Sequence, residues 1–268
     1  MPIVALNREY GSGGTAISRK VAEALGYEYI RDQVTKEAAE AFGVVEDELI
    51  AVVESKPGFW ESLTEAAQVE FAVVAAEVYR LAERDNVVIM GRWATLLLKD
   101  IRHCLRVRLC APMEARIPRV MARRSVKREQ AMDIIRKADA GATARIRQFF
   151  NVEWSDPLLR DLVINTEWVT AESAVSSIVQ LVKRPEFQPT EDSLNRLRDV
   201  SLEARIKAAL RLERETMRLD LNVIADDGRV TLRGPVFSGA AKDSVERIVS
   251  GVAGVRSIEN EVRVFKET

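Results

Sequence analysis

The sequence contains little that would support a metal centre or a disulfide framework. Its 268 residues include two cysteines, Cys104 and Cys110, and a single histidine, His103. One histidine with two cysteines provides too few ligands for a structural zinc site. Both cysteines fall on one predicted strand, where six residues separate them by roughly 20 Å, and a disulfide requires Cα atoms within about 7 Å. A disulfide-stabilised fold is therefore excluded.

An excess of one charge and long apolar runs are missing as well. Forty Lys and Arg residues balance 41 Asp and Glu residues to a net charge of −1, so nothing global predicts binding to nucleic acid or to an anionic membrane. No apolar run approaches the ~18 residues of a membrane-spanning helix, and no basic segment followed by an apolar one opens the chain. We therefore expect a cytoplasmic protein without a transmembrane segment, in which any anion site is a local cluster of arginines.

What the sequence does have is an alternation of short apolar strands with long helical stretches. Apolar runs occur at 3–6, 87–90, 105–110 and 162–165. Helical periodicity fills the intervals at 15–25, 33–42, 47–55, 61–84, 113–124, 128–148 and 171–183. Strands joined by long helices require crossover connections, and uninterrupted apolar strands are buried on both faces. This order predicts an α/β fold, a parallel sheet with helices on both faces.

The composition changes after the last of these helices. Two prolines and several polar residues fill 184–195, which is typical of a linker between domains. We therefore predict a first domain at 1–183 and a second, smaller domain at 196–268.

The second domain has its own order of elements. A helix is predicted at about 193–211, and apolar residues then alternate on both sides of Asp227 and Gly228. An Asp-Gly dipeptide between alternating strands is typical of a type I′ hairpin. A helix at 240–250 and a last strand, "SIENEVRV", complete an α-β-β-α-β unit. About 70 residues fold alone only marginally, so we expect this unit to dock on the first domain or on a partner.

A glycine-rich turn, "NREYGSGG", follows the first predicted strand. Between a strand and a helix, backbone N–H groups and the positive end of the helix dipole converge, and glycines let the backbone approach phosphate oxygens. The template G-x-x-x-x-G-K-[ST] of a phosphate-binding loop lies over 8–15: Gly13 and Thr15 match, but Arg8 replaces the first glycine and Gly14 the lysine. Thr15 offers a hydroxyl to Mg²⁺. By itself, the motif is explained equally well by a turn that binds nothing.

Arginines follow the ends of two further strands. Arg92 comes directly after "VVIMG", at the carboxyl edge of the sheet, where open α/β folds bind ligands. Arg116, Arg119 and Arg123 follow the next strand at i, i+3 and i+7, on one face of a helix. Such a row suits a polyphosphate covered by a lid, although a solvated basic face is the simpler alternative. Asp139, further along, either orients these arginines or is a surface carboxylate.

These residues, in this order, resemble the cytidylate kinase-like family of P-loop nucleoside monophosphate kinases over roughly residues 1–183. The shared stretches are "REYGSGG", "LGYEYIRDQVTKEAA", "GRWA", "APMEARI" and "FFNVEWSDPLLRDLVINT". The resemblance implies a five-stranded parallel sheet, a mobile lid, and an insertion at about 33–84 that binds the monophosphate. It also implies ATP and Mg²⁺ as cofactors and nucleotides as substrates. A glycine in place of the loop lysine is typical of this branch.

The roles predicted for individual residues follow from the loop, the arginines and this resemblance. The ATP phosphates are expected at Gly11, Ser12, Gly13, Gly14 and Thr15, with Mg²⁺ on the Thr15 hydroxyl. The predicted substrate-binding residues are Asp32, Arg92 and Arg116. The predicted catalytic residues are Arg8, Arg119, Arg123 and Asp139. Arg8, or an arginine from the lid, would supply the charge of the missing lysine.

Two departures from the family pattern bear on activity. Relatives usually read Asp-Arg where this chain has Arg31 and Asp32, and an arginine is expected in the lid where it has Ala142. Losing a lid arginine removes charge stabilisation in the transition state, unless Arg145 or Arg147 supplies it. Two functions therefore stay open: a nucleoside monophosphate kinase, or a nucleotide-binding sensor with weak or no activity that signals through the second domain.

Residues from about 196 to 266 resemble a BON domain. The matching stretches are "DDGRVTLRGPV" and "VAGVRSIENEVRV". The resemblance implies a small ligand or a phospholipid as partner, and we expect a sensory or docking role for this module. A third interpretation, nucleic-acid binding through "ARRSVKR", predicts a steep salt dependence, but no aromatic residue is interleaved there to stack on bases. Nucleic acid is therefore not an expected partner.

Overall fold

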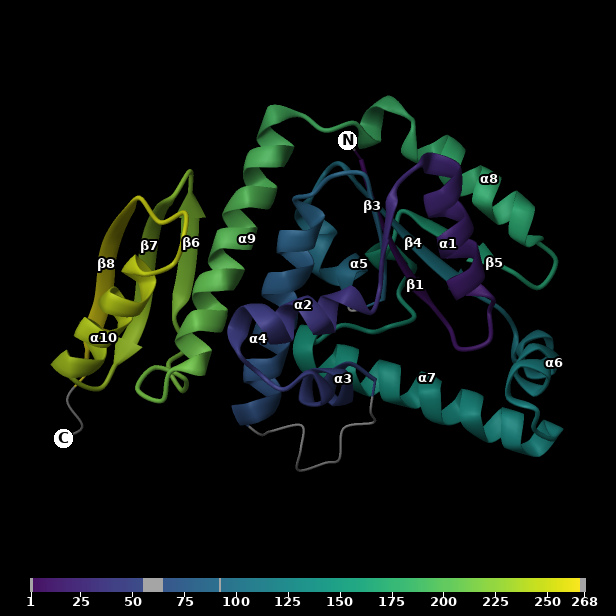
Figure 1. The fold of residues 1–268 in the computed structure, drawn as a ribbon, viewed down its shortest axis with the longest axis horizontal. Coiled ribbons are helices and arrows are strands. Elements are labelled where there is room, and N and C mark those ends of the chain that lie inside the picture. The colour runs from purple at the N-terminus through teal and green to yellow at the C-terminus, as the bar shows by residue number, and fades with distance from the viewer. Residues whose placement is uncertain (1, 55–64, 92, 266–268) are drawn as a thin grey trace.

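A five-stranded parallel sheet forms the centre of the first unit. The structure is a computed structural model, and it describes residues 2–54, 65–91 and 93–265. Within these residues the sheet has the order β2-β3-β1-β4-β5. Its strands are β1 (Ile3–Arg8), β2 (Glu28–Ile30), β3 (Val87–Met90), β4 (Cys104–Cys110) and β5 (Leu162–Asn165). Helices cover both faces (Figure 1), so the α/β fold predicted from the sequence is confirmed.

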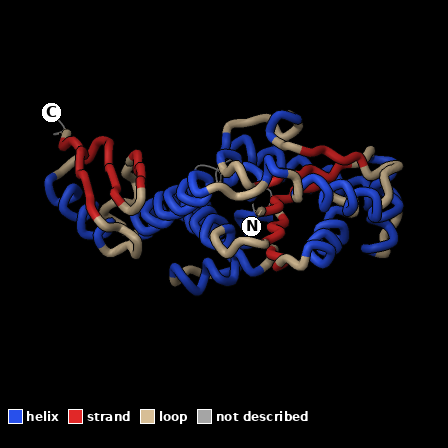
Figure 2. The backbone as a smooth tube through the Cα atoms, turned by 90° about the horizontal axis from the view of Figure 1, so that it is seen from above, coloured by secondary structure: helices blue, strands red, loops and turns tan. Residues whose placement is uncertain are grey.

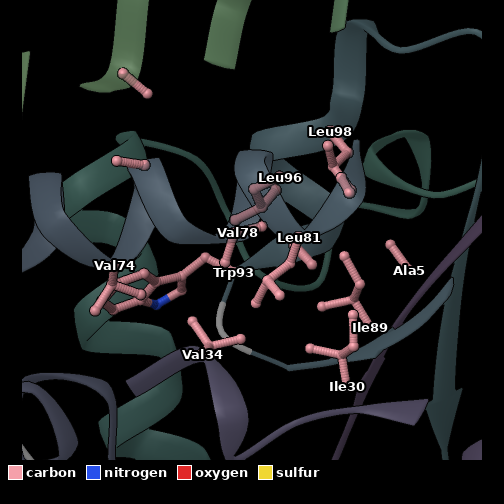
Figure 3. Close-up of a cluster of buried hydrophobic side chains, with 14 of the residues drawn as sticks. Ala5, Ile30, Val34, Val74, Val78, Leu81, Ile89, Trp93, Leu96 and Leu98 are labelled. Carbon is pink, nitrogen blue, oxygen red and sulfur yellow. The ribbon is translucent and has the colours of Figure 1, made fainter. Parts of the chain in front are cut away.

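Successive residues of β1 enter two different cores, because side chains alternate across a strand. Val4 and Leu6 pack under α1 (Gly14–Leu25) and α8 (Ala171–Val182). Ile3 and Ala5 face the other side of the sheet. That side is covered by α2 (Gln33–Phe42), α3 (Glu46–Glu54), α4 (Glu65–Ala82) and α5 (Ala94–Leu97). Figure 3 shows part of this second core, with Ala5, Ile30 and Ile89 of the strands and Val74 and Leu81 of α4.

Residues 71–82 belong to α4, within the helix predicted at 61–84, and most of them are buried. The first four residues of the helix predicted at 61–84 lie outside the described residues. Glu77 is completely buried and forms an ion pair with Arg80 at 2.6 Å, and Arg80 also pairs with Glu37 of α2 at 2.5 Å. In the parts of the chain that the structure describes, the helices are too short or too polar for any of them to cross a membrane.

Two helices beyond β4 form an arm beside the sheet. They are α6 (Met113–Arg124) and α7 (Arg128–Phe150). A small core of their own holds them together: Ile117 and Val120 of α6 pack on Ala131 and Ile135 of α7. In Figure 1, α6 lies at one end of the molecule and α7 runs back from it to α3, which it contacts. The arm includes residue 142, at which the family pattern places an arginine of the lid.

The second unit is an α-β-β-α-β module, as predicted. Its elements are α9 (Glu191–Leu212), β6 (Asn222–Asp226), β7 (Arg229–Val236), α10 (Gly239–Ser250) and β8 (Ser257–Val264). β6 runs antiparallel to β7, and β8 pairs with β7 in parallel. Asp227 (φ 45°) and Gly228 (φ 79°) both have the left-handed backbone of a type I′ turn. The predicted hairpin is therefore confirmed.

α9 belongs to the cores of both units. Leu197 and Val200 join the core around α4, whereas Leu202 and Ile206 pack under the second sheet. The helix lies between the two sheets in both views (Figures 1 and 2). It begins at Glu191, inside the segment predicted as a linker. The two units therefore share one helix.

The start of α9 is attached to the first sheet by a buried polar contact. His103, which precedes β4, places Nδ1 2.9 Å from Ser193 Oγ. The Thr190 hydroxyl caps the helix by accepting a hydrogen bond from the Ser193 N–H at 3.2 Å. Burial lowers the pKa of His103, so the neutral imidazole is favoured at this contact. The polar contact fixes where α9 leaves the first unit.

Glu70, on α4, gives the fold a testable pH dependence. Burial and the charge of Glu48 on α3 raise the pKa of Glu70 from 4.5 to about 7. Since its folded-state pKa lies above the unfolded value, its contribution to stability is complete below about pH 4.5 and is lost as the pH rises to 7. Glu70→Gln is therefore expected to raise the unfolding free energy by about 1 kcal/mol at pH 8, but not at pH 4.5, in urea denaturation. Glu83→Gln, at an exposed position, should show no such difference between the two pH values.

Candidate functional site

The glycine-rich turn lies between the carboxyl end of β1 and the first turn of α1. Gly11 (φ 87°) and Gly13 (φ 80°) have left-handed backbone conformations that a side chain would strain. Gly11 also packs closely on the arm, because a Cβ there would lie 2.9 Å from Val120 Cγ2 on α6. Ser12 Oγ lies 3.1 Å from the Leu109 carbonyl and so faces β4. The turn is thus held between β4 and α6, with the open N-terminus of α1 above it.

Gly14 is a glycine for a different reason. Its backbone is helical, but a Cβ there would lie 2.7 Å from Arg8 Cβ and 3.0 Å from Arg8 Cδ. The Arg8 side chain lies across the first turn of α1, and its Nε donates a hydrogen bond to Thr15 Oγ1 at 3.0 Å. Arg8 therefore occupies the space into which the lysine of the phosphate-loop template would extend from position 14.

Two cavities meet beside Arg8. The first, of about 630 Å³, we call the loop cavity; its lining residues are Arg8, Gly11, Gly13, Gly14, Thr15, Ala16, Arg19, Arg31, Arg119 and Arg123. The second, of about 360 Å³, we call the inner cavity; it is lined by residues that include Tyr10, Trp93, Asp139, Ala142, Arg145 and Trp154. Arg8, Arg31 and Arg123 line both. Three guanidinium groups therefore stand at the boundary between the two cavities.

The boundary is strongly cationic. Burial, together with the charges of Arg31 and Arg123, lowers the pKa of Arg8. Within the described residues, no carboxylate lies within ion-pair distance of Arg8, and none lines the loop cavity. The ring of Tyr10 supports two of the cations, with its centroid 5.7 Å from Arg8 Cζ and 4.6 Å from Arg123 Cζ. Cations gathered in this way favour an anionic ligand.

Arg119 connects the arm to the end of β5. Its Nη2 donates to the Thr166 carbonyl at 2.7 Å and its Nη1 to Thr166 Oγ1 at 3.2 Å. Thr166 Oγ1 in turn donates to the Ser12 carbonyl at 2.8 Å. Thr166 was not among the predicted site residues, although it closes the stretch "LVINT". It holds the glycine turn, β5 and α6 at fixed distances from one another.

Arg116 lines neither cavity, although it was predicted to bind substrate. Its side chain is only 8% exposed, and its Nη1 donates to Asp139 Oδ2 at 2.6 Å and to the Tyr10 carbonyl at 3.3 Å. Asp139 Oδ1 also accepts a hydrogen bond from the Tyr10 N–H at 3.4 Å. The Arg116–Asp139 pair therefore joins α6, α7 and the glycine turn beneath the site.

Of the residues at the two sequence departures, Arg31 and Ala142 lie at the inner cavity and Asp32 does not. Arg31 lines both cavities, whereas Asp32, predicted to bind substrate, lines neither, and its side chain is 74% exposed. Ala142 lines the inner cavity, and so does Arg145; Arg147 does not. Of the two arginines considered as replacements for a lid arginine at 142, the structure thus brings Arg145 to the site. Arg92, predicted to meet the monophosphate, lies outside the described residues.

The Arg116–Asp139 pair is expected to stabilise the fold. Asp139→Asn leaves the buried guanidinium with one carboxylate, Glu9, 4.0 Å from its Nε. We expect the unfolding free energy to fall by about 1–3 kcal/mol, measured by urea denaturation at pH 7. Asp133→Asn, at an exposed position on the same helix, should change it by less than about 0.5 kcal/mol. Equal stability of the two variants would contradict this role for Asp139.

The first unit has a P-loop kinase-like fold. Its parallel sheet is covered on both faces, a glycine-rich loop follows the first strand, and an arm that bears arginines lies over that loop. Residues 3–168 match the model of the cytidylate kinase-like family, and residues 198–265 match the model of the BON domain. The first match covers more than half of the chain. The chain therefore belongs to the cytidylate kinase-like family and carries a C-terminal BON domain.

Individual proteins show the same likeness. The cytidylate kinase of Ignicoccus hospitalis is 26% identical over 186 residues, which cover 68% of this chain and 99% of that protein. The cytidylate kinase of Methanocaldococcus jannaschii is 26% identical over 188 residues, with the same coverage of both chains. An uncharacterized protein from Eubacterium ventriosum has a similar crystal structure, with a TM-score of 0.55 and 21% identity over 69% of this chain and 100% of that one. This last likeness shows the fold alone.

Proposed function

We propose that the protein transfers a phosphoryl group from ATP to a nucleoside monophosphate, with a cytidylate-like acceptor. The observation that supports this most directly is the position of Arg8, Arg31 and Arg123 on the boundary between the loop cavity and the inner cavity. A donor phosphate in one cavity and an acceptor phosphate in the other would meet beside these three guanidinium groups. Curated relatives that match this chain over 99% of their own length are named cytidylate kinases.

The loop cavity has the features of a donor site. The ATP phosphates would lie on the backbone N–H groups of Gly11–Thr15 at the N-terminus of α1, with Arg119 and Arg123 beside them. The Thr15 hydroxyl accepts one hydrogen bond, from Arg8, and keeps a second lone pair, so it can hold Mg²⁺ together with phosphate oxygens and water. When bound, Mg²⁺ neutralises charge on the β- and γ-phosphates.

The inner cavity has the features of an acceptor site. Its volume of about 360 Å³ falls in the range of about 300–1,000 Å³ that is typical of small-molecule sites. Neighbouring side chains hold two of its aromatic rings in place. The Trp154 ring packs on the Arg108 and Arg160 guanidinium groups, 5.0 and 4.4 Å from its centroid, and Trp93 packs on Phe71 at 5.2 Å. A base could stack on these rings while its phosphate turns toward Arg8 and Arg31.

The transfer itself requires positioning and charge neutralisation. An oxygen of the acceptor phosphate attacks the γ-phosphorus in line, the bond from the γ-phosphorus to the bridging oxygen breaks, and ADP leaves. Negative charge accumulates on the three equatorial oxygens of the transferred group. Arg8, Arg31 and Arg123 stand where this charge develops, and a cationic donor held in place before reaction stabilises the transition state more than the ground state.

A second function, a nucleotide-binding sensor, is favoured by Ala142, which leaves the wall of the inner cavity without a guanidinium at that position. A coupled assay with ATP, Mg²⁺ and a panel of CMP, dCMP, UMP, AMP and GMP separates the two functions. Turnover of a pyrimidine monophosphate is the expected result. ATP binding in calorimetry without turnover of any acceptor would favour the sensor, and failure to bind ATP would exclude both.

A further inference from the structure

A third cavity, of about 890 Å³, lies between the two units. We call it the interdomain cavity. One face of α9 forms its floor, with Arg196, Val200, Glu203, Ala204, Lys207 and Arg211. α4 supplies one wall, and the start of β6 with part of β7 supplies the opposite wall. It shares no lining residue with the loop cavity or the inner cavity, so the proposed phosphoryl transfer makes no use of it.

Much of the interdomain cavity is apolar. Small side chains leave the space of the cavity open: Ala72 and Ala75 on α4 and Ala204 on α9 line it. Larger apolar groups, Phe71 of α4 and Leu210 of α9, line the same space. Buried apolar walls between two units, with polar groups at the edge, are typical of sites for small molecules.

The charged groups of this cavity point to the sign of the ligand. Arg196 pairs with Glu203 at 3.6 Å, and Arg233 pairs with Glu261 at 2.5 Å. Arg211 Nη1 donates to the Met217 carbonyl at 2.5 Å. Lys207 is different, because it has neither a hydrogen bond nor an ion pair with any described residue.

Two carboxylates, Asp100 and Asp220, also line the cavity. Counted together, its lining groups are four cations and three anions. Glu261, the partner of Arg233, balances the fourth cation. The expected sign of the ligand therefore comes from position: Lys207 and Arg211 lie on the same face of α9, and neither has an ion pair with any described residue. An anionic group is therefore expected beside Lys207, one helical turn from Arg211.

We propose that the interdomain cavity is a binding site for a small amphipathic anion, a molecule with an apolar body and one carboxylate, sulfonate or phosphate group. The apolar body would lie on Ala72, Ala75 and Ala204. The anionic group would lie beside Lys207. A bilayer cannot enter the space between the two units, so the ligand is a free molecule and not a lipid within a membrane.

The wall of this cavity packs against the wall of the acceptor site. Phe71 and Phe149 stack at 4.6 Å with an angle of 7° between their planes, and both line the interdomain cavity. Trp93 lies 5.2 and 5.3 Å from these two rings and lines the inner cavity. A ligand against the Phe71–Phe149 pair would therefore change the KM for the acceptor. This consequence rests on the proposed function, whereas binding of the anion does not.

The test uses the full-length protein and 8-anilinonaphthalene-1-sulfonate, a fluorescent amphipathic anion. Inorganic tripolyphosphate is kept in excess to occupy the arginines of the loop cavity. We expect saturable enhancement with one probe per chain. Ala72→Trp occupies the part of the cavity where the apolar body would lie and should abolish binding, and Lys207→Ala should weaken it about 5- to 10-fold, which is the loss of one charge-assisted contact. Arg198→Ala, on α9 but outside the cavity, should leave the affinity unchanged.

Circular dichroism and the unfolding midpoint establish that each variant is folded. If Ala72→Trp does not fold, the pair Lys207→Ala and Arg198→Ala decides the question alone. Equal affinities of these two variants, or binding that Ala72→Trp leaves intact, would overturn the proposal. Sedimentation with vesicles of phosphatidylglycerol and phosphatidylcholine distinguishes the lipid source: vesicle binding that displaces the probe would also overturn it. These outcomes do not depend on kinase turnover.

Discussion

Replacing Arg8 by glycine is expected to lower the turnover of phosphoryl transfer by about 10²–10³-fold, the loss typical of removing one preorganised charge donor from a transition state. The expectation rests on position. Arg8 lines both cavities, donates to the Thr15 hydroxyl at 3.0 Å and has its pKa lowered by burial and by two neighbouring arginines. No lysine in the loop can take over its role, because residue 14 is a glycine.

The companion change is Gly14→Lys. In the wild-type background it should also impair turnover, because a Cβ at residue 14 would lie 2.7 Å from Arg8 Cβ and the two side chains would collide. The double variant Arg8→Gly with Gly14→Lys removes the collision and rebuilds the template G-x-x-x-x-G-K-[ST] over residues 8–15. We expect it to recover about 10-fold or more of the turnover lost in Arg8→Gly.

The four proteins form a double-mutant cycle, which isolates the coupling between the two positions. Turnover is measured in the coupled assay, and the Kd for ATP is measured by calorimetry to separate binding from transfer. Lys20→Ala removes an exposed cation of α1 that pairs with Glu172 and should change turnover less than twofold. If the double variant is no more active than either single variant, Arg8 does not stand in for the lysine.

The relation between Arg8 and Gly14 illustrates what the sequence could and could not predict about the site. The glycines of the loop could be predicted as functional because a tight turn between a strand and a helix requires backbone conformations that favour glycine. The close approach of the Arg8 side chain to Gly14 could not be predicted, because it depends on how the chain folds back between residues 8 and 14. Sequence reasoning named Arg8 as one of two sources of the missing charge, and the structure adds the contact that explains why residue 14 has no side chain.

The arginine row shows a similar limit. Helical spacing places Arg116, Arg119 and Arg123 on one face of α6, yet only the last two line the loop cavity. The direction of Arg116 is decided by Asp139, 23 residues later on another helix. Periodicity within one helix cannot predict a partner on a second helix. The position of Arg31 at both cavities could not be predicted from the sequence either, because it depends on where α2 begins.

The strands were predictable to the extent that they are buried. β1 and β3 each contain four consecutive apolar residues, and β4 is mostly apolar although two arginines interrupt it, whereas β2 has three residues and a single fully buried one, Ile30. α9 was predicted as a helix, but not as a shared one. The sequence contains both apolar faces of this helix. Tertiary packing determines which core each face joins, and the sequence pattern of one helix does not predict it.

Leu197→Ala and Ile206→Ala are expected to destabilise the protein by about 2–5 kcal/mol each, the usual cost of truncating a large apolar side chain in a core. Leu197 is 2% exposed and packs in the core around α4; Ile206 is 0% exposed and packs under the second sheet. Because the two residues lie on one helix, loss of either core removes the support of the other. Both variants should therefore lower the midpoint of one and the same unfolding transition in calorimetry.

Leu212→Ala, at the exposed end of α9, should shift that midpoint by less than a quarter as much, because its side chain is already 37% exposed. Two separate transitions, of which Ile206→Ala lowers one and Leu197→Ala the other, would show that the units unfold independently. If the transition is shared, the second unit cannot lose its structure without loosening the core around α4, to which Trp93 of the inner cavity belongs. The cooperativity of unfolding is thus a direct measurement of how strongly the two units are coupled.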